Sequence, residues 1–154
     1  MSELDFNDAP DHPVPLLETW LRDGRTRTSL PNPNAMTLAT VDEDGRPSAR
    51  IVLLRGLDER GAVFFSNYES RKGRALAAHQ QAALVFHWDD LERQVRIEGS
   101  VSKVTDEESD AYWMTRARES RIGAWASRQS QTLPDKETLQ RQIESFRERF
   151  EGEE

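Results

Sequence analysis

The sequence predicts a single domain of the α+β class, in which short antiparallel strands form a barrel that helices flank. Between residues 35 and 104, five or six short β-branched runs are separated by tight-turn signals. Helical periodicity precedes and follows this region. A chain of 154 residues is long enough for one core, and its 36% hydrophobic content is modest. We therefore expect a partner subunit to complete part of the core.

The N-terminal region is expected to be a mobile tail followed by a short amphipathic helix. Residues 1–12 are polar and acidic. The helix is predicted to end at Gly24, and its apolar residues recur at helical spacing: Leu16, Leu17, Trp20 and Leu21. Asparagine and proline make residues 29–34 a loop. We divide the chain into this tail and helix, residues 1–28, and a barrel domain, residues 29–154.

Three strands in succession are predicted to form an antiparallel meander. Residues 35–41 are apolar and β-branched, and residues 42–45 form a hairpin turn that ends in glycine. Residues 48–54 are the return strand, and their apolar run reads as a buried central strand. A second turn at residues 58–61 precedes a third strand at residues 62–67.

The second half of the chain alternates helices with two further strands. Ser70 is a helix cap for residues 71–79, and strands are expected at residues 82–88 and 94–104. Thr105 opens a capping box, which predicts a helix from Asp106 to the region of Arg116.

Two more helices are predicted at the C-terminal end. The first is short and covers residues 121–127, and the second opens at Pro134 and Asp135. The final helix carries an apolar stripe that needs a covering surface, formed by Leu139, Ile143, Phe146 and Phe150.

Composition and charge exclude several classes of protein. No run approaches the roughly 20 apolar residues of a membrane span, and no signal pattern is visible, so we expect a cytoplasmic protein. The chain has no cysteine, and its three histidines lack ligand spacing, so we expect no disulfide and no metal site. The net charge is −7, yet residues 46–130 carry 14 basic and 12 acidic residues. A basic middle in an acidic protein favours a small anionic ligand over nucleic acid.

Ser70, Arg71 and Lys72 form the most informative local motif. A helix N-terminus carries partial positive charge, so cations at its first two positions are unfavourable unless an anion binds there. Two solvated basic residues are the alternative interpretation. The motif therefore indicates a phosphate site or a merely tolerated helix end.

Other polar residues follow strand and helix patterns. Arg50 and Arg55 bracket four apolar residues, and strand parity places them on opposite faces. Gln94 and Arg96 share one face, away from Arg93. Three hydrogen-bond donors are spaced i, i+4 and i+8: Tyr112, Arg116 and Ser120. On a continuous helix they would form one stripe, which would suit a phosphate monoester. The alternative is an ordinary polar helix edge.

Together these runs and their spacing resemble the pyridoxine/pyridoxamine 5'-phosphate oxidases, flavin enzymes that make pyridoxal phosphate, over about residues 34–150. The resemblance implies an FMN-binding split barrel and a homodimer with its sites at the subunit interface. It implies FMN contacts at Arg50, Ile51, Val52, Leu53, Leu54, Arg55, Phe65, Ser66, Arg71, Lys72, Gln94, Gln129 and Ser130. It implies substrate-phosphate contacts at Arg55, Tyr112, Arg116 and Ser120, with Arg55 standing where the family usually has lysine.

Three functions stay open from the sequence. The first is FMN-dependent oxidation of pyridoxamine or pyridoxine 5'-phosphate by oxygen, with release of hydrogen peroxide. The second is a split-barrel flavin oxidase with another substrate, as in phenazine pathways, and the third is a non-catalytic protein that binds FMN or pyridoxal phosphate. The family continues past this chain's last residue with Trp-Gly-Gly and Arg-Leu-His-Asp-Arg runs, so the chain is expected to be either a truncated oxidase or a short relative. No catalytic residue is assigned, because the flavin carries the chemistry.

Overall fold

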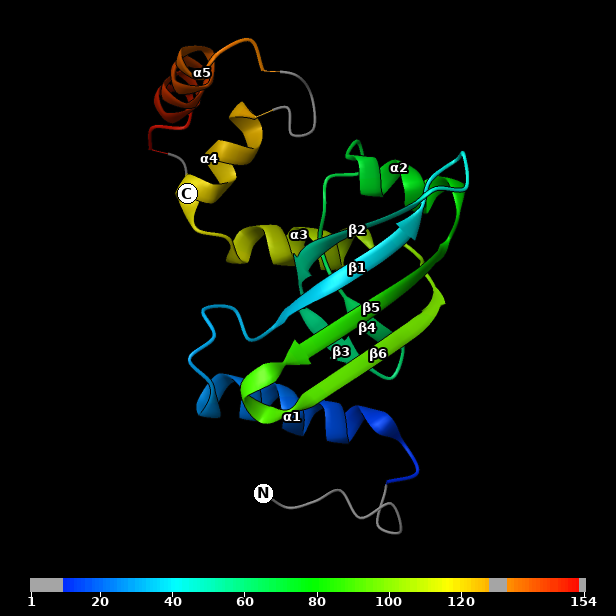
Figure 1. The fold of residues 1–154 in the computed structure, drawn as a ribbon. Helices are drawn as coiled ribbons and strands as arrows, with labels where there is room; N and C mark the ends of the chain where they lie inside the picture. Colours follow the sequence, from blue (N-terminus) through cyan, green and yellow to red (C-terminus); the bar gives the residue numbers. More distant parts are fainter. Residues whose placement is uncertain (1–9, 128–132, 153–154) are drawn as a thin grey trace.

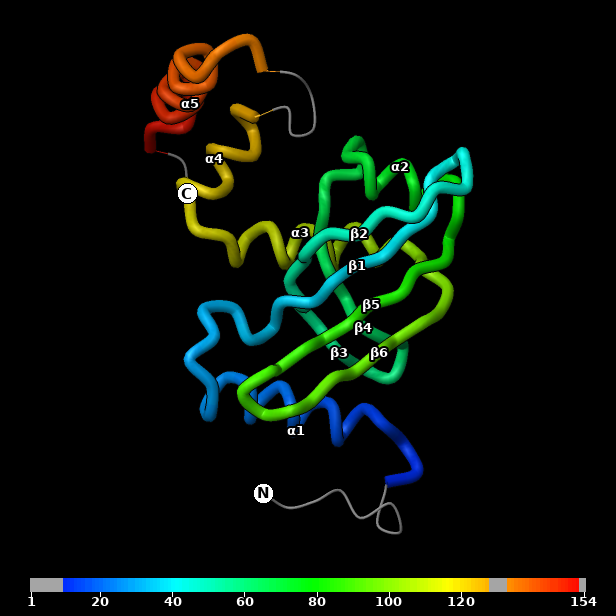
Figure 2. The backbone as a smooth tube through the Cα atoms, in the orientation of Figure 1, coloured from blue at the N-terminus to red at the C-terminus, as the bar shows by residue number. Residues whose placement is uncertain are grey.

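The structure of the protein, a computed structural model, describes residues 10–127 and 133–152 (Figures 1 and 2). Short strands occupy the middle of the chain and helices lie at both ends of it. In chain order the elements are α1 (Pro13–Arg27), β1 (Ala35–Val41), β2 (Pro47–Leu53), β3 (Gly56–Asp58), β4 (Gly61–Val63), α2 (Arg71–Ala78), β5 (Gln81–Trp88), a 3₁₀ turn (Asp89–Leu91), β6 (Arg93–Ser100), α3 (Asp106–Thr115), α4 (Arg118–Ala126) and α5 (Lys136–Arg149).

The strands form an open, curved antiparallel arrangement. Four of them make one sheet in the order β2-β1-β5-β6, and β3 and β4 pair separately. Leu38 of β1 lies opposite Arg50 of β2 on one side and Leu84 of β5 on the other. Figure 1 shows the β3–β4 pair behind the larger sheet. A hydrogen bond of 2.8 Å from the Arg55 amide to the Val63 carbonyl links the end of β2 to β4, so the α+β barrel predicted from the sequence is confirmed.

The core lies between the four-stranded sheet and α1. Alternate residues of each strand point there, as strand geometry requires. Trp88 is 1% exposed, and its indole nitrogen donates to the Pro33 carbonyl at 2.7 Å, which satisfies its one polar group. The buried cluster consists of Leu17, Leu21, Met36, Leu38, Val52, Leu54, Leu84, Phe86 and Trp88.

Helix α1 does not end at Gly24, so that prediction was wrong. The helix continues to Arg27, and Gly24 is buried within it. A β-carbon on Gly24 would lie 2.8 Å from the Trp88 indole nitrogen, so glycine permits the close approach of helix and strand. An ion pair of 2.6 Å between Asp23 and Arg93 fastens α1 to β6 nearby.

Several strand predictions need correction. The run at residues 50–55 is not in a central strand, because β2 is an edge of the four-stranded sheet and Ile51 is 64% exposed. The strand predicted at residues 62–67 ends at Val63, and β3 was not recognised as a strand. Strands of three residues, such as β3 and β4, are too short to show an alternating pattern in the sequence. Their pairing with each other stabilises them.

Helices α3 and α5 follow their sequence signals, whereas α4 begins at Arg118, three residues before the predicted start. Thr105 and Glu108 form the predicted capping box, and Asp135 caps α5. Part of the stripe on α5 packs against α4, since the Trp125 ring lies 6.3 Å from Phe146 and 6.1 Å from Phe150. Figure 1 shows that α4 and α5 project away from the sheet.

Candidate functional site

A cluster of three cations lies where β2 approaches the N-terminus of α2. Arg50 points from β2 with the parity of the buried Val52, which holds its guanidinium at the edge of the core. That guanidinium donates to the Leu38 carbonyl at 3.1 Å, to Thr40 Oγ1 at 2.8 Å and to Ser48 Oγ at 2.7 Å. All three acceptors are neutral, so they orient the Arg50 side chain without neutralising it.

The start of α2 contributes the other two cations. Ser70 is buried and caps the helix, accepting from the Gly73 amide at 3.2 Å, as the sequence predicted. Lys72 Nζ donates to the same Ser70 hydroxyl at 3.3 Å, while Arg71 lies 3.3 Å from an Asp42 carboxylate oxygen. A β-carbon on Gly73 would lie 2.1 Å from the Tyr68 carbonyl, so glycine allows this turn to fold against the helix.

The three cations repel one another. Burial lowers the pKa of Lys72, and the nearby charge of Arg50 lowers it further. Burial, and secondly the charge of Arg71, lowers the pKa of Arg50. Among the described residues, the only carboxylate within 4.0 Å of any of the three is Asp42. An anion bound between these side chains would relieve the repulsion, as expected of a phosphate site at a helix N-terminus.

A second group joins residues that are distant in sequence. The rings of Phe65 and Tyr112 stack at 3.9 Å with an angle of 3° between their planes. The Arg55 guanidinium lies 5.6 Å from the centre of the Tyr112 ring. Arg55 and Tyr112, which are expected at the substrate phosphate, therefore lie beside Phe65, which is expected at the flavin.

Tyr112, Arg116 and Ser120 do not lie on one continuous helix, which corrects the predicted stripe. Helix α3 ends at Thr115, Arg116 has extended backbone angles, and α4 begins at Arg118. The Arg116 guanidinium donates to the Ser120 carbonyl at 3.0 Å and lies 5.0 Å from the Trp113 ring centre. Neither proline nor glycine occurs between residues 112 and 120, so the sequence carried no signal for this break.

The remaining predicted contacts divide between the two faces of the sheet. Val52 and Leu54 are core residues, which leaves only their backbone for a ligand. Ile51 and Gln94 point to the outer face and are exposed. Gln94 and Arg96 share that face and Arg93 points away from it, as predicted. Gln129 and Ser130 lie outside the described residues.

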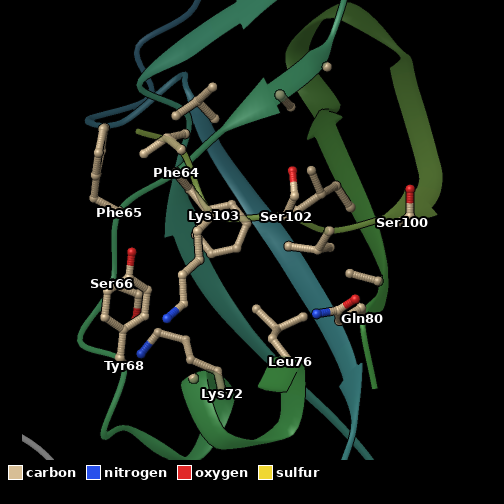
Figure 3. Close-up of a pocket in the computed structure, with 18 of the residues that line it drawn as sticks. Phe64, Phe65, Ser66, Tyr68, Lys72, Leu76, Gln80, Ser100, Ser102 and Lys103 are labelled. Carbon is tan, nitrogen blue, oxygen red and sulfur yellow. The ribbon is translucent and has the colours of Figure 1, made fainter. Parts of the chain in front are cut away.

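A cavity of about 740 Å³ opens beside the cation cluster (Figure 3). Its walls come from the segment after β4, from α2, and from the ends of β5 and β6 with residues 101–105. Phe65, Ser66 and Lys72 line it. Sequence reasoning missed Tyr68 and Lys103, whose cation–π contact of 4.5 Å depends on a fold that brings residues 35 positions apart together.

Two other kinds of feature do not occur in the described residues. No group of three or more metal-ligating side chains occurs in residues 10–127 and 133–152. No helix in this described part of the chain has the length and apolarity to cross a membrane.

The curved antiparallel barrel, with a cationic helix start beside it, places the protein in the split-barrel class. A family profile described as pyridoxamine 5'-phosphate oxidase matches residues 23–150. The chain belongs to the pyridoxamine 5'-phosphate oxidase family.

Curated relatives share more than half of their aligned residues with this chain. A pyridoxine/pyridoxamine 5'-phosphate oxidase of Cupriavidus necator is 57% identical over 150 residues, which cover 97% of this chain and 69% of the relative. The enzyme of the same name from Burkholderia lata is 55% identical over 149 residues, with the same coverage of both chains.

Two solved structures are similar to this fold. PhzG of Burkholderia lata, in complex with tetrahydrophenazine-1-carboxylic acid, has a TM-score of 0.85 and 31% identity, covering 91% of this chain and 69% of its own. A pyridoxamine 5'-phosphate oxidase-related FMN-binding protein of Nostoc punctiforme has a TM-score of 0.66 and 19% identity, covering 86% of this chain and 72% of its own. The second likeness concerns the fold alone.

Proposed function

We propose that this protein is an FMN-dependent oxidase that converts pyridoxamine or pyridoxine 5'-phosphate to pyridoxal 5'-phosphate. The reaction removes a hydride from the 4' carbon and a proton from the attached oxygen or nitrogen, and the two electrons and two protons reduce oxygen to hydrogen peroxide. With pyridoxamine 5'-phosphate the product is an imine, which water hydrolyses to the aldehyde and ammonia. The relatives at 52–57% identity carry the name of this activity, which supports the substrate class. The structural observation that carries the proposal is the cation cluster of Arg50, Arg71 and Lys72, whose charges are offset by one described carboxylate.

The cluster has the donors that an FMN phosphate requires. Arg50 offers a guanidinium already oriented by three neutral acceptors, Lys72 a partly buried ammonium, and the α2 N-terminus its dipole. FMN, when bound, supplies the hydride acceptor for the reaction. The remaining proposed FMN contacts are Ile51, Val52, Leu53, Leu54, Arg55, Phe65, Ser66, Gln94, Gln129 and Ser130.

A homodimer is part of the proposal. Ile51 and Gln94 point to the exposed outer face of the sheet, whereas Arg50 of the cation cluster points to its inner side. A second subunit against this face would exclude water from a flavin ring bound there and would bury Ile51. Exclusion of water strengthens every charge interaction within such a site.

The substrate phosphate is assigned to Arg55, Tyr112, Arg116 and Ser120. Arg55 already lies against Tyr112, and Tyr112 stacks on Phe65, so this group borders the proposed flavin contacts. Arg116 is anchored through the Ser120 carbonyl at the turn between α3 and α4. These residues would hold the ester phosphate and so orient the 4' carbon for hydride removal.

A second candidate is an oxidase of phenazine precursors. The observation in its favour is the TM-score of 0.85 to PhzG, whose structure contains tetrahydrophenazine-1-carboxylic acid. The 31% identity to PhzG is well below the 57% identity to the Cupriavidus necator enzyme, which favours the vitamin phosphate.

Hydrogen peroxide release separates the candidates. The FMN-loaded protein is expected to release peroxide with pyridoxamine 5'-phosphate, and to do so far more slowly with dephosphorylated pyridoxamine, because the phosphate contacts are then lost. Peroxide release only with a dihydro- or tetrahydrophenazine carboxylate would support the second candidate and contradict the first. Release with neither substrate would contradict both.

A further inference from the structure

We propose that the cavity between α2 and residues 101–105 is a second ligand site, which takes a small monoanion with an apolar body, such as an aromatic carboxylate. The inference goes beyond the proposed oxidase activity. Its anchor is Lys103, which lies outside every proposed flavin and substrate contact.

The size and walls of the cavity suit a small molecule. Its volume of about 740 Å³ falls within the range of roughly 300–1,000 Å³ that is usual for ligand sites. Figure 3 shows Phe64 and Leu76 facing the interior, and Leu84 of β5 and Ile97 of β6 also line it. An occupant would therefore remove apolar surface from water on several sides, which favours binding of an apolar body.

One end of the cavity is cationic. In Figure 3 the ammonium groups of Lys72 and Lys103 point into the same space beside Tyr68. Lys103 Nζ lies 4.5 Å from the Tyr68 ring centre. No carboxylate of residues 10–127 or 133–152 lies within 4.0 Å of either ammonium.

The acidic residues of the lining do not cancel this charge. Glu98 is paired with Arg96, and Glu108 is paired with Arg60 at 2.7 Å. Glu69 is exposed at the turn before α2. A carboxylate on the ligand would meet two available ammonium groups, while the ligand's apolar body lies against the aliphatic walls.

The cavity adjoins the proposed flavin site and is not identical with it. Phe65, Ser66 and Lys72 line the cavity, whereas Arg50 and Arg71 do not. If the flavin phosphate binds Lys72, Lys103 remains as the cation available to the second ligand. The test therefore rests on Lys103.

Calorimetry with two probes of the same shape measures the contribution of charge. 2-Naphthoate and 2-naphthamide differ in charge, and both are titrated into protein saturated with FMN. The protein is expected to bind 2-naphthoate about three- to tenfold more tightly than 2-naphthamide, as for one partly exposed charge contact. Lys103→Gln is expected to abolish this preference. Lys136→Gln is the matched control, because Lys136 is exposed on α5, and it should retain the preference.

A second variant tests whether the apolar cavity itself is occupied. Leu76→Trp places additional volume in the cavity and is expected to weaken both probes together, with folding verified by circular dichroism. If this variant fails to fold, the exposed Lys103→Gln variant decides alone.

Three results would overturn the proposal: displacement of 2-naphthoate by FMN, equal affinity for both probes, or, in FMN-saturated protein, a preference that survives Lys103→Gln. Repeating the titration without FMN keeps the test independent of the flavin assignment. Lys72 is then also available to the ligand, so Lys103→Gln should reduce the preference for 2-naphthoate, and an undiminished preference would overturn the proposal.

Discussion

Removing the charges at the start of α2 should weaken FMN binding with little damage to the fold. In the double variant Arg71→Ala/Lys72→Ala the helix loses two cations but keeps its Ser70 cap. A hydrogen bond to a charged group contributes about 1.5–3 kcal/mol, and exposed ion pairs contribute about 0–1 kcal/mol. The Arg71 side chain is 63% exposed and already paired with Asp42, so its contribution to FMN binding is small. We therefore expect a loss of about 2–4 kcal/mol, or roughly 30- to 1,000-fold in affinity, most of it from Lys72.

The single variant Lys72→Met tests this division. It preserves the length of the side chain and removes the ammonium that Arg50 repels. The unfolding free energy of the FMN-free protein should therefore not fall, and a loss of FMN affinity cannot be ascribed to misfolding.

Quenching of flavin fluorescence measures the affinity. Lys136→Ala is the control, because Lys136 is likewise the first residue of a helix but lies on α5. Its FMN affinity should match that of the unchanged protein. Unchanged FMN affinity in the Arg71/Lys72 double variant would refute the phosphate assignment and, with it, the argument from helix-start cations.

Four further predictions follow from other parts of the structure. Arg116→Ala should weaken pyridoxal 5'-phosphate binding by about 2–3 kcal/mol and leave FMN affinity nearly intact, as calorimetry with each ligand would measure; equal loss of both ligands would contradict it. Gly24→Ala should lower the free energy of unfolding in urea by about 1–3 kcal/mol, because the added methyl group would overlap the Trp88 indole, and an unchanged value would contradict the packing argument. The hydrogen bond from Arg93 holds the pKa of Asp23 below its usual 3.8, so this carboxylate stabilises the fold above that pH and loses its effect as the pH falls. Asp23→Asn should therefore lower the melting temperature at pH 7, and the melting temperatures of the variant and the unchanged protein should converge in acid. Sedimentation should show a homodimer that FMN favours by linkage, and a monomer with and without saturating FMN would oppose it.

Much of the helical structure was predictable because its signals are local. Ser70, Thr105 and Asp135 each cap the helix that the sequence assigned to them, since a cap depends on residues three positions away. The hairpin of β1 and β2 was likewise specified by its turn.

The parts that the sequence did not predict depend on tertiary contacts. In the sequence, Gly24 is typical of a helix end. The close packing of Trp88 against it, which explains the glycine, appears only in the fold. The edge position of β2 depends on the order of strands in the sheet, which is non-local, and so the exposure of Ile51 was missed. In each case packing against a distant element overrides the local pattern.

The site residues likewise divide into those with a local sequence signal and those whose position depends on tertiary contacts. The cations at Arg71 and Lys72 were recognisable from their place at a helix start, whereas the convergence of Arg50 on them required the fold. The α3–α4 break at Arg116 had no glycine or proline to signal it, and it replaced the predicted stripe with a turn. The contact of Tyr68 with Lys103 joins two loops and leaves no periodic trace.

The absorbance of the bound flavin shows whether this protein oxidises pyridoxamine 5'-phosphate. FMN-loaded protein is mixed with pyridoxamine 5'-phosphate in the absence of oxygen, and its visible spectrum is followed. We expect the oxidised flavin band to bleach, pyridoxal 5'-phosphate to form in equal amount, and the band to return when oxygen is admitted. A spectrum that stays oxidised with saturating pyridoxamine 5'-phosphate would contradict the proposal that this protein is a pyridoxamine-phosphate oxidase.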